Sequence, residues 1–114
     1  MNAQKFLPEG TTPDLASRYV NHLKSKIDMF EISCGLNNFI STIRPAPIRK
    51  IIKYTYGLKF EEGYNLSFAE QIKHDNPDTI IASVGGFRTL TVMENAIKNV
   101  DMISISRPFV REPD

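Results

Sequence analysis

The sequence predicts an α/β protein with parallel strands, because predicted helices and strands alternate along the chain. Strands are expected at 27–34, 79–84 and 101–106, and each follows a predicted helix. Alternation at this spacing implies parallel pairing through right-handed crossovers. The run 79–84 is almost entirely apolar, which is typical of a strand covered on both faces. We therefore expect three parallel strands in sequence order, with the helices packed on one side.

The first predicted helix has a strong start signal at Thr12-Pro13-Asp14. The threonine is expected as the N-cap, and proline takes the first helical position. The apolar residues that follow recur at helical spacing: Leu15, Tyr19, Val20 and Leu23. The helix is expected to bury this face and to end near Lys26.

The strand 27–34 is expected to have one apolar wall and one more polar wall. The apolar parity holds Phe30, Ile32 and Cys34, and the other parity holds Met29, Glu31 and Ser33. Glu31 is either a buried carboxylate or, as we prefer, a glutamate paired with a nearby cation or amide. No histidine lies near Cys34 in the sequence, so we interpret it as a buried small residue and not as a nucleophile.

Residues 35–63 form the least regular part of the sequence. Pro45 and Pro47 interrupt it, and a short helix is expected over 48–56. The region also holds a cluster of positive charges: Arg44, Arg49, Lys50, Lys53 and Lys59. We interpret the cluster as a solvated helix face or as a lid over an anionic ligand, in preference to a nucleic-acid or membrane surface.

Two further helices are expected in the C-terminal half. The stretch Ser67-Phe68-Ala69-Glu70 matches a capping box, although Asn65 is an alternative cap, and Asn76-Pro77 ends this helix. A second capping box, Thr91-Val92-Met93-Glu94, is expected to begin the next helix.

Composition indicates one ordinary globular domain, 1–114, without a global charge that points to nucleic acid or to a membrane. The chain has 114 residues, of which 41% are hydrophobic and 24% charged, and a net charge of +1. One cysteine excludes an internal disulfide and fits a reducing compartment. With neither a signal peptide nor a spanning apolar run, we expect a cytoplasmic protein.

The predicted elements do not complete a barrel. A full (β/α)8 TIM barrel needs about 250 residues, and no strand is predicted before the first helix and no helix after the last strand. We therefore expect the C-terminal portion of a larger α/β protein, with three β/α repeats of a partial TIM barrel.

Two strand ends one repeat apart predict a phosphate site. Gly85 and Gly86 follow one strand and let the backbone approach a ligand closely, and Arg107 follows the next. The helix after Thr89 is expected to add the positive end of its dipole. Parallel β/α barrels bind phosphate between the loops after their last two strands. The alternative is that the glycines make a tight turn and that Arg107 is a solvated charge.

Three motifs in order closely resemble the C-terminal part of the old yellow enzyme family of FMN-dependent NAD(P)H:flavin oxidoreductases, or ene-reductases. They are EGYNLSFA at 62–69, IASVGGFR at 81–88 and DMISISRPFVREPD at 101–114. The upstream IDMFEISCG at 27–35 is similar to the sixth strand of that family. The resemblance covers nearly the whole chain.

The resemblance implies a role for four residues in holding the FMN phosphate. The backbone of Gly85 and Gly86 would bind it after the seventh strand, and Ser106 and Arg107 after the eighth. Many members have glycine where this chain has Ser106, whose N–H can still donate. The family's catalytic residues, flavin-ring contacts and substrate contacts come from earlier strands, so no catalytic residue and no metal ligand is assigned. The chain alone is expected to be inactive, and NAD(P)H would serve only the full-length enzyme.

Two other functions remain open at this stage. One is a non-enzymatic phosphate-binding or self-assembling half-barrel module. The other is a phosphate-binding barrel acting on a phosphosugar or nucleotide precursor, against which the EGYN and RPF motifs argue. Without an opposite wall, Met29, Ser83 and Met102 are expected to lie open on the sheet. We therefore expect a homo-oligomer or association through the open sheet edges.

Overall fold

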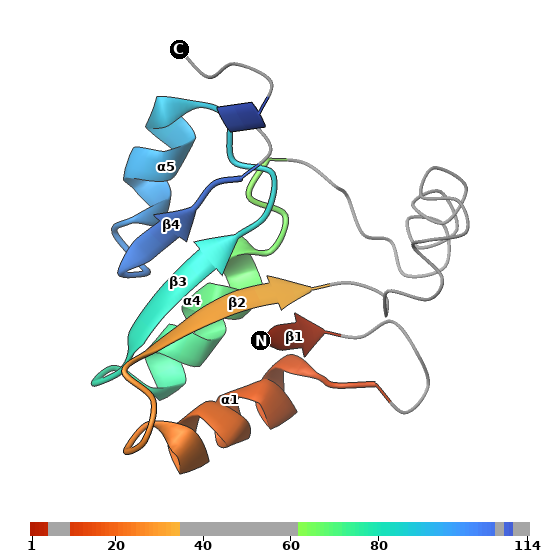
Figure 1. The fold of residues 1–114 in the computed structure, drawn as a ribbon, viewed down its shortest axis with the longest axis vertical. Helices are drawn as coiled ribbons and strands as arrows, with labels where there is room; N and C mark the ends of the chain where they lie inside the picture. Colours follow the sequence, from red (N-terminus) through yellow and green to blue (C-terminus); the bar gives the residue numbers. More distant parts are fainter. Residues whose placement is uncertain (5–9, 35–61, 107–108, 111–114) are drawn as a thin grey trace.

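The structure is a computed structural model that describes residues 1–4, 10–34, 62–106 and 109–110. The elements of this part alternate between strand and helix (Figure 1): β1 (Asn2–Gln4), α1 (Pro13–Leu23), β2 (Met29–Cys34), α4 (Leu66–Asp75), β3 (Ile80–Val84), α5 (Leu90–Ala96) and β4 (Met102–Ser104). The predicted helix over 48–56, the positive cluster and Arg107 lie outside the described residues.

The strands form one all-parallel sheet in the order β1-β2-β3-β4. The prediction of parallel strands in sequence order is therefore confirmed for β2, β3 and β4. β1 corrects the expectation that no strand precedes the first helix: Asn2 lies in register with Ser33, and Ser33 N–H donates to Met1 O at 2.8 Å. The prediction missed β1 because it has only three residues and only Ala3 is apolar, too few for a hydrophobic period.

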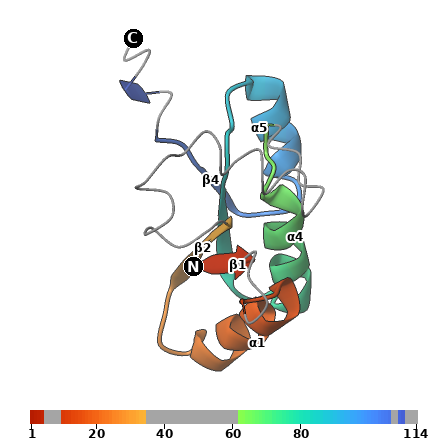
Figure 2. The ribbon, with the colours of Figure 1, turned by 90° about the vertical axis from the view of Figure 1, so that its right-hand side faces the viewer.

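The helices α1, α4 and α5 of the described residues lie on the same side of the sheet, as predicted (Figure 2). The core between the two layers consists mainly of small and aliphatic side chains: Ala3, Ala16, Val20, Phe30, Ile32, Ala69, Ile72, Ile81 and Val100. Burial of one large apolar side chain contributes about 1.5–3 kcal/mol. The core therefore holds the described helices to one face of the sheet, and none of them covers the other face, called the bare face below.

The bare face of the sheet carries large apolar side chains at the N-terminal ends of three strands. Met29, Ile80 and Met102 are 44%, 46% and 48% exposed, so the strand 79–84 is not covered on both faces along its length. Ser83 is fully buried and pairs in register with Ile32, on the helix side, which corrects its expected place on the open wall. Glu31 is exposed, so it is not a buried carboxylate.

The helix ends follow the sequence signals only in part. At α1 the prediction is confirmed, because Leu15 N–H donates to Thr12 Oγ1 at 3.3 Å, although the helix ends at Leu23 and not near Lys26. Both predicted capping boxes are wrong, whereas the alternative cap Asn65 does occupy the N-cap position of α4, without a side-chain cap hydrogen bond. Asn65 precedes α4 and Thr89 precedes α5, and each uses its side chain for contacts outside its own helix.

Candidate functional site

The predicted phosphate-binding segments leave the sheet at the same edge. Val84 of β3 lies in register with Ser104 of β4, and both strands run in the same direction. Gly85 and Gly86 follow β3 directly, and Ser106 stands two residues beyond β4. The topology therefore brings three of the four predicted residues to neighbouring positions at the carboxyl edge.

The two glycines have different reasons for being glycine. Gly86 has a φ of 70°, a left-handed conformation that a side chain disfavours. Gly85 is buried, and a Cβ on it would lie 3.0 Å from the Asn65 Cβ. Its carbonyl accepts a hydrogen bond from Gly63 N–H at 2.9 Å. The missing side chain at Gly85 thus leaves room for the turn that contains Gly63 and Asn65. The positive φ of Gly86 sets the direction in which the loop leaves β3.

Glu62 meets the backbone just before α5. One carboxylate oxygen accepts from Arg88 N–H at 2.6 Å and from Thr89 N–H, and the other accepts from the Thr89 hydroxyl at 2.9 Å. The hydrogen bonds from Thr89 N–H and Arg88 N–H lower the pKa of Glu62 from its usual value. The donors at the start of α5 therefore already have an anionic partner within the chain, which corrects the expected use of this helix end for phosphate.

Asn65 joins the ends of two strands below the glycine loop. Its fully buried amide donates to Ile32 O at 2.5 Å and to Val84 O at 3.1 Å. The sequence offered Asn65 only as an alternative helix cap, and no local pattern indicates a bridge between residues 33 and 19 positions away. The amide ties the carboxyl ends of β2 and β3 together directly beside Gly85.

Ser106 is exposed, and its carbonyl accepts from Phe109 N–H at 3.2 Å. Cys34, at the end of β2, is half-buried, and burial raises the pKa of its thiol to about 11. A thiol in this state is a poor nucleophile, as the sequence indicated. The carboxyl edge thus offers backbone donors and a hydroxyl.

The opposite edge of the sheet is held by a charged network. Asp101 accepts from Ile81 N–H at 2.8 Å and pairs with Lys73 Nζ at 2.9 Å. Lys73 also donates to the carbonyls of Pro77 and Thr79, at 3.1 and 2.8 Å. The partners belong to the last turn of α4, to the start of β3 and to the junctions before β3 and β4, so we interpret this network as structural.

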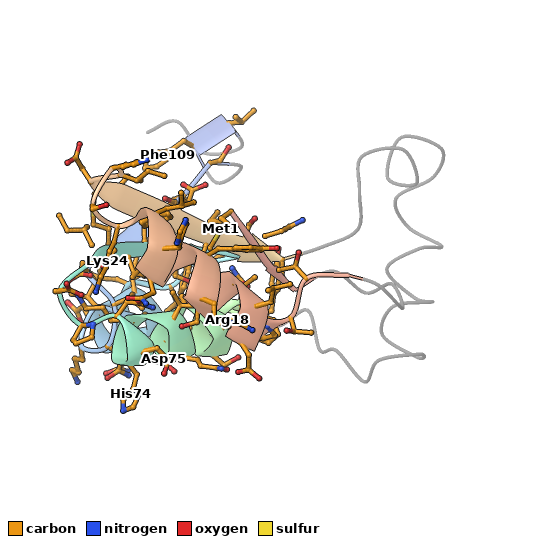
Figure 3. All side chains as sticks on the ribbon, turned by 90° about the horizontal axis from the view of Figure 1, so that it is seen from below. Met1, Arg18, Lys24, His74, Asp75 and Phe109 are labelled. Atoms are coloured by element: carbon orange, nitrogen blue, oxygen red, sulfur yellow. The ribbon has the colours of Figure 1, made fainter. Side chains whose placement is uncertain are left out.

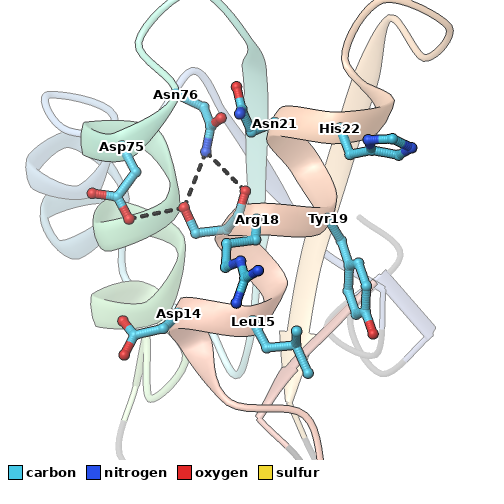
Figure 4. A pocket seen from close by; sticks show the side chains of 9 residues that line it. Asp14, Leu15, Arg18, Tyr19, Asn21, His22, Asp75 and Asn76 are labelled. Atoms are coloured by element: carbon cyan, nitrogen blue, oxygen red, sulfur yellow. Dashed lines mark hydrogen bonds between the residues drawn. The ribbon is translucent and has the colours of Figure 1, made fainter.

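A hollow on the outer surface between α1 and α4 contains polar side chains (Figures 3 and 4). Ser17 Oγ donates to Asp75 Oδ2 at 2.8 Å, and Asn76 Nδ2 donates to Ser17 Oγ at 3.1 Å. These three side chains hydrogen-bond to one another across the contact between the two helices, although Asn76 Oδ1 is buried without a partner among the described residues. They lie on the helix layer and not at the carboxyl ends of β3 and β4, and we assign the hollow to helix packing.

In the described part of the chain, no group of three or more His, Cys, Asp or Glu side chains is arranged to hold a metal ion. Nor does any helix there combine the length and apolar character needed to cross a membrane. The sequence matches no family model and no curated protein.

Proposed function

We propose that this chain is the C-terminal, FMN-phosphate-binding portion of an NAD(P)H:flavin oxidoreductase of the old yellow enzyme type. The observation that carries the proposal is the parallel sheet in sequence order, with Gly85-Gly86 and Ser106 at the same carboxyl edge. A partial TIM barrel is the finer fold that accounts for this order with the described helices on one face.

The described residues fit the phosphate end of FMN. Backbone N–H groups after β3 and β4 are the donors that such a dianion takes, and Arg107 would add a charged fork. FMN supplies hydride chemistry when bound, whereas this chain's own residues would only hold its phosphate. Among the described residues none is assigned to the flavin ring, to the substrate or to proton transfer, so reduction of an enone with NADPH is expected at background level.

The proposal is tested by titrating the chain with inorganic phosphate and with FMN while following backbone amides by NMR. Charge-assisted hydrogen bonds contribute about 1.5–3 kcal/mol each, so a few of them predict roughly millimolar affinity. FMN should bind hardly better than phosphate. Arg107→Ala and Gly86→Val should abolish binding, while Arg88→Ala, as a matched loss of charge, should leave it nearly unchanged. Unmoved amides of Gly85, Gly86 and Arg107 at high phosphate would contradict the proposal.

The bare face of the sheet supports a second candidate function, a self-assembling half-barrel module. Met29, Ile80 and Met102 expose apolar surface, and β1 and β4 present sheet edges at which a second parallel sheet can pair. Sedimentation at tens of micromolar should then show a dimer or higher oligomer, and Met102→Lys should shift it toward monomer. A monomer of the unchanged chain under these conditions would exclude this function.

A further inference from the structure

The loop between β3 and α5, residues 85–89, is held at both of its ends by the turn that precedes α4. At the first end, Gly63 N–H donates to Gly85 O at 2.9 Å. At the second end, the Glu62 carboxylate accepts from Arg88 N–H, Thr89 N–H and the Thr89 hydroxyl. Two consecutive residues of one turn therefore fix the start and the end of the loop.

The middle of the loop has a third contact with the same turn. Phe87 is only 2% exposed, and its Cε1 would lie 3.2 Å from a Cβ placed on Gly63. Gly86 stands between these contacts with its φ of 70°. No hydrogen bond between described residues uses its N–H. The turn thus leaves the Gly86 N–H as a donor in a loop whose flanking residues are fixed.

We propose that Glu62 is a positioning residue: it holds the 85–89 loop in the conformation that presents the Gly86 N–H group to a phosphate. This inference rests on the proposed function, because it names what orients the same site. A loop with three fixed points loses less conformational freedom when an anion binds, and that preorganisation increases affinity.

The charge of Glu62 allows an opposite role, and the two roles predict opposite results. A carboxylate near the loop also repels a phosphate or competes with it for donors. If repulsion dominates, removal of the charge strengthens phosphate binding. If positioning dominates, removal of the acceptor weakens binding although the net charge becomes more favourable.

The experiment compares phosphate affinity among variants of the 114-residue chain, with inorganic phosphate as the probe and amide shifts as the readout. Glu62→Ala should weaken binding about tenfold, or ~1.4 kcal/mol. Glu62→Gln keeps a carbonyl acceptor and should weaken binding less. Glu94→Gln is the matched control, because it removes an equal charge from an exposed position on α5. Its affinity should stay within twofold of the unchanged chain.

Thr89→Val tests the positioning role of Glu62 from the side of its partner. It removes only the hydroxyl bond to Glu62 and should weaken phosphate binding about threefold, or ~0.7 kcal/mol. All affinities are measured well below the thermal midpoint of each variant, so that a loss of global stability does not enter. Equal or tighter binding by Glu62→Gln and Thr89→Val would overturn the positioning role while leaving the phosphate site intact. No binding by the unchanged chain would instead overturn the proposed function itself, and the positioning role with it.

Discussion

Replacement of Asn65 by alanine should lower the free energy of unfolding by about 2–4 kcal/mol. The change removes two hydrogen bonds, to Ile32 O and Val84 O, from a fully buried position. Each contributes about 1 kcal/mol net, and a buried acceptor left without a partner costs about 1–3 kcal/mol more. The Asn65 Oδ1 atom is itself buried without a partner among the described residues, which offsets part of the loss. The estimate is a large share of a typical total of about 5–15 kcal/mol.

Urea unfolding followed by circular dichroism measures this loss. With a slope of about 1.5 kcal/mol/M, a loss of 3 kcal/mol moves the midpoint by about 2 M. Ser67→Ala is the control, because Ser67 is an exposed residue inside α4. It should change stability by less than about 0.5 kcal/mol, whereas loss of a true N-cap costs about 1 kcal/mol. A loss below about 1 kcal/mol for Asn65→Ala, or an equal loss for Ser67→Ala, would refute the strand-bridging role.

Three further outcomes are expected. Gly85→Ala should destabilise the chain by about 1–3 kcal/mol through overpacking against Asn65, and unchanged thermal stability would contradict that contact. Burial opposes ionisation of Asp101, but the hydrogen bond from Ile81 N–H and the ion pair with Lys73 outweigh it and lower its pKa. The stabilisation that ionised Asp101 contributes is fully present above the usual Asp pKa of about 3.9. It is lost as pH falls through the pKa of Asp101 in the folded state. Asp101→Asn should therefore flatten the acid limb of stability against pH, and an unchanged limb would argue against the network. Cys34 has a pKa of about 11, so its thiol should be alkylated at neutral pH about 100-fold more slowly than a free thiol. Mass spectrometry measures this rate, and alkylation at the free-thiol rate would contradict the burial of Cys34.

The sequence predicted the elements with long periodic or apolar patterns and missed those set by distant contacts. Local signals such as Thr12-Pro13 and the apolar run before Gly85 predicted α1, β2 and β3. The alternation of helices and strands predicted that β2 and β3 are parallel. β1 is too short to carry a period, and it forms because β2 offers an edge. The capping boxes failed because α4 begins at Leu66 and α5 at Leu90, so Ser67 and Thr91 lie inside the helices and cannot cap them.

In the candidate site, too, features set by local sequence signals were predicted and features set by distant contacts were missed. The register of β3 and β4 follows from their parallel order, so the shared edge of Gly85 and Ser106 was predictable. The contact of Glu62 with Arg88 and Thr89 joins residues 26 and 27 positions apart, and no spacing rule indicates it. Sequence reasoning therefore located the loop but not the carboxylate that holds it.

The equality of strand order and chain order has a consequence for how this protein folds. Among the described residues, each strand pairs with the next one along the chain, so each of these sheet contacts closes a single loop and none waits for a distant segment. Residues 35–79 separate β2 from β3, and residues 85–101 separate β3 from β4. Because closure entropy grows only with the logarithm of length, the longer connection costs about 0.9 kcal/mol more than the shorter one. β3 and β4 should therefore pair first, and insertions between β2 and α4 should slow folding only slightly.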